Sequence, residues 1–107
     1  MEDVNDSYDI LYLKMQQKSS EAALWAVYIV ICSDKTFYTG ITTNIDKRII
    51  AHNSGKRGAK YTRARRPVSL VAIIEAPSKS AALKCEFAIK QCKKNDKIKT
   101  LKNWKFE

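Results

Sequence analysis

The strongest constraint on the fold is an uninterrupted apolar stretch at residues 24–32, the longest in the chain. Nine residues are too few to cross a bilayer, which takes about 20. Residues 25–32 are rich in β-branched side chains, and this combination predicts a buried β-strand. Ser33, Asp34 and Lys35 follow as a turn, after which residues 37–41 return as a second strand. We therefore expect the folded part of the chain to open with a β-hairpin.

The remaining elements follow from periodicity and from capping residues. An amphipathic segment with Asp46 in its first turn comes directly after the hairpin, and a third β-rich run lies between two prolines. The resulting order, β-β-α-β-α-α, predicts an α/β (α+β) domain with a small, three-stranded, mostly antiparallel sheet flanked by helices. The elements expected after the hairpin are a helix from Thr43 or Asn44 to about residue 53, a strand at 68–75, a helix from Ser78 or Ser80 to about residue 92, and a helix from Asn95 or Asp96 towards Leu101.

Charge is distributed unevenly along the 107 residues. Lys and Arg total 20 against 11 acids, for a net charge of +9. Residues 1–26 hold five acids and two lysines, whereas residues 27–107 hold 18 bases and six acids. A compact body this positive is expected to bind polyanions, because each neutralised phosphate releases condensed counterions. Nucleic acid is the leading candidate, and an anionic membrane surface is the second.

The chain divides by composition near residue 24. Residues 1–24 are expected to form an extension, flexible in part or a short helix, and residues 25–107 a single domain. The N-terminus carries acids rather than a basic region, which argues against a secretory signal. Three cysteines are an odd number without metal-ligand spacing, so we expect neither a disulfide nor a zinc site. These features predict an intracellular protein, cytoplasmic or nuclear, that is not secreted and does not enter a membrane.

The hairpin loop decides whether two tyrosines share a face. A three-residue loop pairs Val30 with Tyr38 and Tyr28 with Gly40, which places both phenols diagonally on one side of the sheet. The opposite side of the first strand carries the core residues, so the Tyr28 phenol is expected to meet solvent or substrate. By the strand pattern alone, both could equally be ordinary strand tyrosines.

Three further polar residues stand at the edges of predicted helices. Arg48 and His52 are four residues apart, hence on one helical face, and border the stripe that Ile45 begins. A solvated Arg48 and a boundary His52 are the simpler reading of these two positions taken alone. Glu86 lies in a mostly apolar helix, which suits a carboxylate that binds a hard cation. Its simpler role is an ion pair with Lys90, worth only about 0.3–0.5 kcal/mol.

These residues together resemble a known family. Ala26-Val27-Tyr28 followed by Tyr38-Thr39-Gly40 is similar to the paired motifs of GIY-YIG endonucleases, and Arg48, His52 and Glu86 follow in the family's order and spacing. The resemblance covers residues 25–102 and fits the compact, single-domain branch of the family. Ala26-Val27 replaces Gly-Ile, and Thr39 replaces the middle Ile, but both changes spare the tyrosines and Gly40. Each motif is short, whereas five positions in the right order are a specific signal.

The resemblance implies a metal-dependent hydrolysis of DNA phosphodiesters, structure-selective and linked to repair or recombination. Tyr28 would be the general base, assisted by Tyr38 or His52, and Arg48 would stabilise charge on the phosphoryl oxygens. Glu86 would bind Mg²⁺, or Mn²⁺ in its place, as a Lewis acid. An ordinary phenol has a pKa near 10, so His52 is the better base at neutral pH and both remain open.

A basic segment without acids occupies residues 56–66. Such a run is usually a solvated loop or a localisation signal, but here it adjoins the expected site and would grip a nucleic-acid backbone. Tyr61 within it would stack on a base. The expected contacts are Lys56, Arg57, Lys60, Tyr61, Arg63, Arg65 and Arg66.

Two other classes of function compete with the enzyme. One is a non-catalytic nucleic-acid-binding module that keeps the nuclease fold, and the other is a basic RNA-associated protein, which explains the charge but not the five ordered residues. The expected partner is duplex or branched DNA. With no separate DNA-reading domain, selectivity would come from the shape of the substrate or from a protein partner.

Overall fold

The computed structural model describes residues 24–106. The expected extension at residues 1–24 therefore lies almost wholly outside the described residues. The described residues form three strands and four helices in the order β-β-α-α-β-α-α. They are β1 (Trp25–Ile31), β2 (Phe37–Thr42), α2 (Ile45–Asn53), α3 (Lys60–Arg63), β3 (Ser69–Ala76), α4 (Lys79–Gln91) and α5 (Lys94–Lys102).

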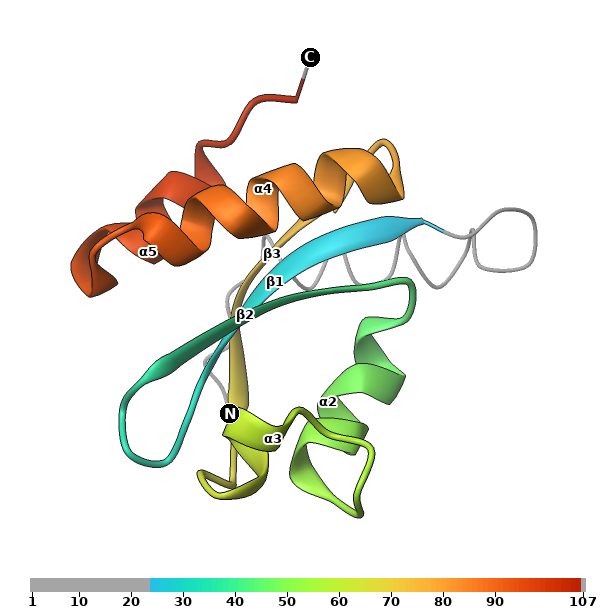
Figure 1. Ribbon diagram of the computed structural model, residues 1–107, viewed down its shortest axis with the longest axis vertical. Coiled ribbons are helices and arrows are strands. Elements are labelled where there is room, and N and C mark those ends of the chain that lie inside the picture. The colour runs from blue at the N-terminus through green and yellow to red at the C-terminus, as the bar shows by residue number, and fades with distance from the viewer. Residues whose placement is uncertain (1–23, 107) are drawn as a thin grey trace, which may run out of the picture.

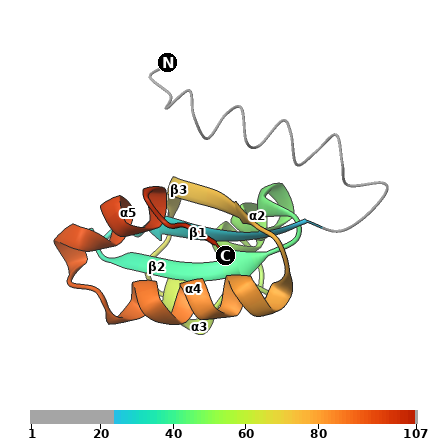
Figure 2. The same ribbon diagram turned by 90° about the horizontal axis from the view of Figure 1, so that it is seen from above.

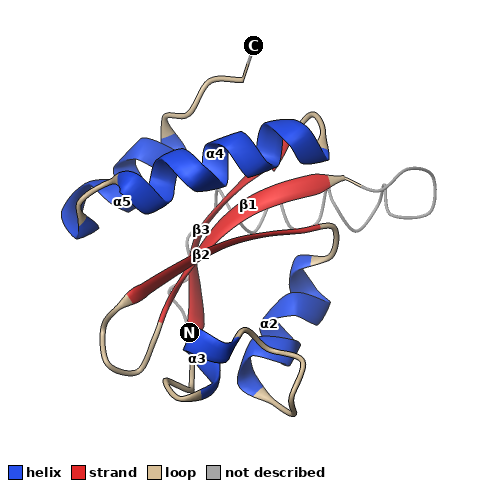
Figure 3. Ribbon diagram, viewed as in Figure 1, coloured by secondary structure: helices blue, strands red, loops and turns tan. Residues whose placement is uncertain are grey.

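The three strands form one antiparallel sheet covered by helices on both faces (Figures 1 and 3). The strand order is β2-β1-β3, so the apolar β1 is the central strand. Helices α4 and α5 cover one face, and α2 and α3 lie against the other (Figure 1). Seen from above, α4 runs beside β2 and α5 lies near β3 (Figure 2). The predicted fold class is confirmed.

Because β1 is central, its alternating side chains build two separate cores. Val27 and Ile29 pack with α4 and α5 on one face, where Leu101 is fully buried. Ala26, Tyr28 and Val30 pack with α2 on the other face. Tyr28 is fully buried beneath α2, so the expectation that its phenol meets solvent was wrong.

The hairpin has the predicted register and the predicted loop. Val30 pairs with Tyr38, and Tyr28 pairs with Gly40. The Cys32 amide donates to the Thr36 carbonyl at 2.8 Å, which closes a loop of three residues. Lys35 at its end has φ of +70°, the left-handed region that such a loop requires. Tyr28 and Tyr38 therefore lie on the same face of the sheet.

The left-handed backbone at Lys35 predicts the effect of substitutions there. A β-carbon in this region costs about 1 kcal/mol, which glycine avoids, although glycine also gains freedom in the unfolded chain. We expect Lys35→Gly to raise the free energy of unfolding by up to about 1 kcal/mol and Lys35→Val, with a branched β-carbon, to lower it. Thermal melting of the two variants beside wild type checks this order. A glycine variant that melts below wild type would contradict it.

Two of the predicted helix caps are confirmed and one is wrong. The Asn44 side chain accepts from the Lys47 amide at the start of α2, and the Ser78 hydroxyl accepts from the Ala81 amide at the start of α4. Helix α5 begins after Lys93, earlier than the Asn95 or Asp96 cap that we predicted, and without a side-chain cap. Helix α3 was not predicted, because four residues in a basic segment carry no apolar period.

Candidate active site

Tyr28 occupies the middle of the central strand and has no exposed surface (0%). Its ring lies across Gly40 of the neighbouring strand, where an added β-carbon would stand 2.6 Å from the phenol oxygen. Any other residue at position 40 would therefore displace the Tyr28 hydroxyl. The position of the Tyr28 ring therefore requires glycine at position 40.

His52, on the last turn of α2, is the hydrogen-bond partner of this phenol. Its Nε2 lies 2.7 Å from the Tyr28 hydroxyl, and its Nδ1 lies 2.8 Å from the Thr62 hydroxyl in α3. The side chain is fully buried, whereas we predicted a position at the edge of the apolar stripe. The segment after α2 folds back over it, and Gly58 packs so closely that a β-carbon would stand 2.5 Å from the Ala51 carbonyl oxygen.

The directions of these hydrogen bonds assign the tautomer of His52. The Thr62 hydroxyl donates its only proton to the Ala59 carbonyl at 3.0 Å, since a carbonyl can only accept. Towards His52, Thr62 must then accept, so Nδ1 carries the proton. In the neutral imidazole Nε2 is an acceptor, and the Tyr28 hydroxyl donates to it. The phenol proton therefore points at a base.

Burial sets the acid–base state of both groups. It raises the pKa of the Tyr28 hydroxyl to about 12, although the adjacent Arg48 acts in the opposite direction. It also lowers the pKa of His52 to about 4, with the charges of Arg48 and Arg66 adding to the effect. At neutral pH the pair is therefore a protonated phenol and an uncharged imidazole.

The lowered pKa of His52 predicts an acid-sensitive fold. The unfolded chain takes up this proton near pH 6.5 and the folded chain only near pH 4, so stability is lost as pH falls through this window. From pH 7.5 to pH 5 we expect a loss of roughly 2 kcal/mol in the free energy of unfolding. His52 is the chain's only histidine, so His52→Gln should remove this slope. Denaturant melts at several pH values measure it, and a slope retained in the variant would refute the assignment.

Arg48 lies one turn before His52 on α2 and contacts the same phenol. Its Nε donates to the Tyr28 hydroxyl at 3.3 Å, and its Nη1 donates to the Arg57 carbonyl at 3.0 Å. The side chain is half-buried, as predicted, while its neighbour Lys47 is exposed. An oriented guanidinium therefore adjoins the phenol oxygen.

Tyr38 extends the cluster towards the surface. Its ring meets His52 edge-on, with centroids 5.2 Å apart, and stacks on Tyr61 at 6.1 Å. The ammonium of Lys90 lies 5.9 Å from the centre of the same ring. Tyr38 is half-buried, so it is the more accessible of the two phenols.

Glu86 lies on α4, on the side of the cluster where Lys90 approaches Tyr38. Its carboxylate pairs with Lys90 at 3.3 Å, and the side chain is only 17% exposed. Its charge contributes to the raised pKa of Tyr28, which places it in electrostatic reach of the phenol. Within residues 24–106, no group of three His, Cys, Asp or Glu side chains is gathered for a metal ion. The donor set around Glu86 is therefore a single carboxylate.

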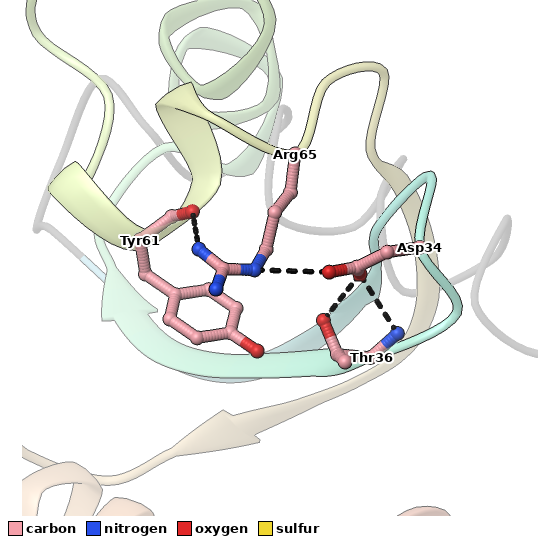
Figure 4. Close-up of polar contacts among 4 residues, drawn as sticks. All are labelled: Asp34, Thr36, Tyr61 and Arg65. Atoms are coloured by element: carbon pink, nitrogen blue, oxygen red, sulfur yellow. Dashed lines mark hydrogen bonds and ion pairs between the residues drawn. The ribbon is translucent and has the colours of Figure 1, made fainter.

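The basic residues of the 56–66 segment divide by their partners. Arg66 donates to the His52 carbonyl at 2.7 Å and to the Gly55 carbonyl at 2.8 Å, which caps the end of α2. Arg65 pairs with Asp34 of the hairpin turn at 3.0 Å and covers the Tyr61 ring at 3.8 Å (Figure 4). Four others have exposed side chains: Lys56, Arg57, Lys60 and Arg63. Of these, Arg63 also has a partner, because its Nη1 donates to the Lys56 carbonyl at 3.0 Å.

The structure thus brings together Tyr28, Tyr38, Arg48 and His52, with Glu86 close by. Sequence reasoning missed Thr62, the second partner of His52, which is fully buried between the exposed Tyr61 and Arg63. A lone threonine in a basic run carries no signal for such a role. It also missed the close packing of Gly58, although a glycine in a predicted loop is a general indication of a tight approach.

The fold and this cluster define a small nuclease-like domain, and comparison with known proteins names the class. Residues 24–102 match the GIY-YIG catalytic domain, and the chain belongs to the GIY-YIG family. Within residues 24–106, no helix combines the length and apolarity needed to span a bilayer.

Similar proteins include UPF0213 proteins from several bacteria. The one from Desulfotalea psychrophila is 53% identical over 77 residues, covering 72% of this chain and 70% of that protein. The one from Syntrophus aciditrophicus is 54% identical over 76 residues, covering 71% and 87%. A solution NMR structure of the UPF0213 protein from Bacillus halodurans is 43% identical, covers 74% of this chain and 83% of that one, and has a TM-score of 0.46.

Proposed function

We propose that this protein is a Mg²⁺-dependent endonuclease that hydrolyses DNA phosphodiester bonds. The observation that carries the proposal is the hydrogen bonding of Tyr28, whose hydroxyl donates to a neutral imidazole while accepting from Arg48. A phenol between a base and a cation is arranged to take a proton from a third molecule. Membership of the GIY-YIG family supports a nucleic-acid substrate.

The proton path follows from the two pKa values. The pKa of the Tyr28 hydroxyl is raised and that of His52 is lowered, so complete transfer of the phenol proton to His52 is unfavourable in the protein alone. A concerted relay avoids this cost. As the water oxygen bonds to phosphorus, its proton moves to the Tyr28 oxygen and the phenol proton moves to His52 Nε2. The leaving oxygen separates and takes a proton from solvent.

We assign the role of direct base to Tyr28 rather than to His52, because both ring nitrogens of the buried His52 already have partners, Tyr28 and Thr62. Tyr28 is also buried and its hydroxyl accepts from Arg48, so we expect Arg48 to move when the substrate binds. Its Nη1 donates to the neutral Arg57 carbonyl, and a phosphate is the stronger acceptor because the hydrogen bond is charge-assisted. Phosphate binding would therefore draw Arg48 towards the substrate, where its charge stabilises the transition state.

The residues present fit a Mg²⁺ ion. Mg²⁺ in phosphate chemistry is held by one or two carboxylates, with waters and substrate oxygens completing the octahedron, and Glu86 supplies one half-buried carboxylate. Bound there, the ion would supply Lewis acidity to the phosphoryl group. Lys90 would release Glu86 at little cost, since exposed helical pairs contribute about 0.3–0.5 kcal/mol. Mn²⁺, which prefers the same oxygen ligands, should substitute.

The exposed bases of the 56–66 segment would hold the DNA backbone. Lys60 and Arg63 belong to α3, and Lys56 and Arg57 lie between α2 and α3 in the chain. Both helices lie against the face of the sheet that carries Tyr28 (Figure 1). Arg65 and Arg66 are held by partners in the chain and would keep the segment in place. Tyr61, with Arg65 over its ring, would contact the DNA at its edge. Selectivity among duplex and branched DNAs would come from substrate shape or from a protein partner.

The rival function is a binding module that keeps the fold without catalysis, and Arg48 distinguishes the two. We expect Arg48→Ala to lower kcat by two to three orders of magnitude, since an oriented charge in the transition state is worth about 3–4 kcal/mol. Arg48→Lys should restore little of the lost kcat, because lysine lacks the planar guanidinium that binds two phosphate oxygens at once. Lys47→Ala removes the same charge one residue away and should leave kcat unchanged. If Arg48→Ala weakens DNA binding with no change in kcat, Arg48 is a positioning contact and the binding module is favoured.

A further inference from the structure

Helix α3 contributes a buried residue to the active site although its other side chains are exposed. Thr62 is fully buried, while Lys60, Tyr61 and Arg63 around it are exposed. The helix lies beside α2 beneath the sheet (Figure 1). A buried hydroxyl in a four-residue helix must be satisfied, and Thr62 meets this need with the Ala59 carbonyl and His52 Nδ1.

We propose that Thr62 is a positioning residue that fixes His52 in the Nδ1–H tautomer, so that Nε2 is always the acceptor facing Tyr28. The proposal rests on the proposed nuclease function. The reason is the direction of the two Thr62 hydrogen bonds. The Thr62 proton is held by Ala59, so the hydroxyl can offer His52 only a lone pair, and a ring with a bare Nδ1 would face that lone pair without a proton between them.

The opposite tautomer would disable the relay. With its proton on Nε2, the imidazole would donate to the Tyr28 oxygen, which already accepts from Arg48. The phenol proton would then have no acceptor in His52, and the proton of the attacking water would have nowhere to go. The tautomer of a histidine is commonly set by the partner of its other nitrogen, and loss of such a partner costs about tenfold or more in activity.

The experiment compares Thr62→Val, which keeps the shape and loses the hydroxyl, with Thr62→Ser, which keeps it. Long-range ¹⁵N–¹H NMR of the folded protein reports the tautomer directly, and one histidine in the chain makes the signal unambiguous. We expect Nδ1–H in wild type and in Thr62→Ser, and a shift towards Nε2–H in Thr62→Val. The kcat of Thr62→Val should fall at least about tenfold with little change in KM, and serine should restore it.

Thr39→Val is the matched control. Thr39 is also buried (4%), on the other face of β2, at the motif position where the family carries isoleucine. It should change neither the tautomer nor kcat. Folded Thr62→Val with wild-type tautomer and wild-type kcat would overturn the proposal. If this variant does not fold, an Nε2–H signal in wild type alone would overturn it. A wild-type protein that cleaves no DNA refutes the nuclease function, whereas the tautomer measurement still decides the role of Thr62.

Discussion

Replacing Glu86 by glutamine should abolish Mg²⁺-dependent DNA cleavage and leave DNA affinity within a few-fold of wild type. The substitution removes a ligand charge and almost no volume. Within residues 24–106, no cluster of other acidic or histidine side chains stands ready to hold the ion instead. The amide also gives up the ion pair with Lys90, but a pair of this kind contributes only a few tenths of a kcal/mol, so the fold should persist. Single-turnover cleavage and a binding titration, both in Mg²⁺, measure the two effects separately.

Asp96→Asn is the control for charge. Asp96 lies on α5 in an exposed ion pair with Lys99. Its substitution by asparagine changes the net charge by the same amount as Glu86→Gln, but outside the candidate site. It should cleave at the wild-type rate. Undiminished cleavage by Glu86→Gln, in a preparation free of other nucleases, would remove Glu86 from the mechanism.

Tyr28→Phe should lower the rate of cleavage by about two to four orders of magnitude, the usual contribution of a general base. The ring keeps its packing over Gly40, whereas His52 and Arg48 lose a hydrogen-bond partner. Two unpaired groups in a buried site cost a few kcal/mol of stability, so the melting temperature should fall as well. Cleavage is therefore measured below the melting transition of the variant.

Tyr38→Phe is the comparison that identifies the reacting phenol. Tyr38 is the more exposed tyrosine and contacts His52 through its ring edge, which phenylalanine retains. We expect a much smaller loss than for Tyr28→Phe. The reverse order of effects would mean that Tyr38, and not Tyr28, receives the proton of the attacking water.

The hairpin was predictable because it depends on counting residues. Strand alternation and a three-residue loop fix the pairing of Tyr28 with Gly40, and the left-handed Lys35 follows from the same loop. Helices α2 and α4 were predictable from Asn44 and Ser78, whose short polar side chains cap a helix through hydrogen bonds of fixed geometry.

The burial of the site was not predictable from local pattern. Tyr28 lies beneath α2 because β1 is the central strand, and strand order depends on pairing between distant segments. His52 stands at the border of the helical stripe by periodicity, and it is enclosed only because Gly58 and Arg66 bring the following segment back over α2. Thr62 is hydrogen-bonded to His52, ten residues earlier in the chain. It lies in a basic segment that carries no apolar period.

The most direct test of the nuclease assignment is cleavage by the wild-type chain of labelled linear, flapped and four-way-branched DNAs and of RNA, in Mg²⁺, in Mn²⁺ and in EDTA. We predict cleavage of at least one DNA with either metal, none in EDTA, and none by Glu86→Gln under the same conditions. Stable binding of these DNAs without cleavage of any of them, in either metal, would contradict the assignment and identify the chain as a binding module with the nuclease fold.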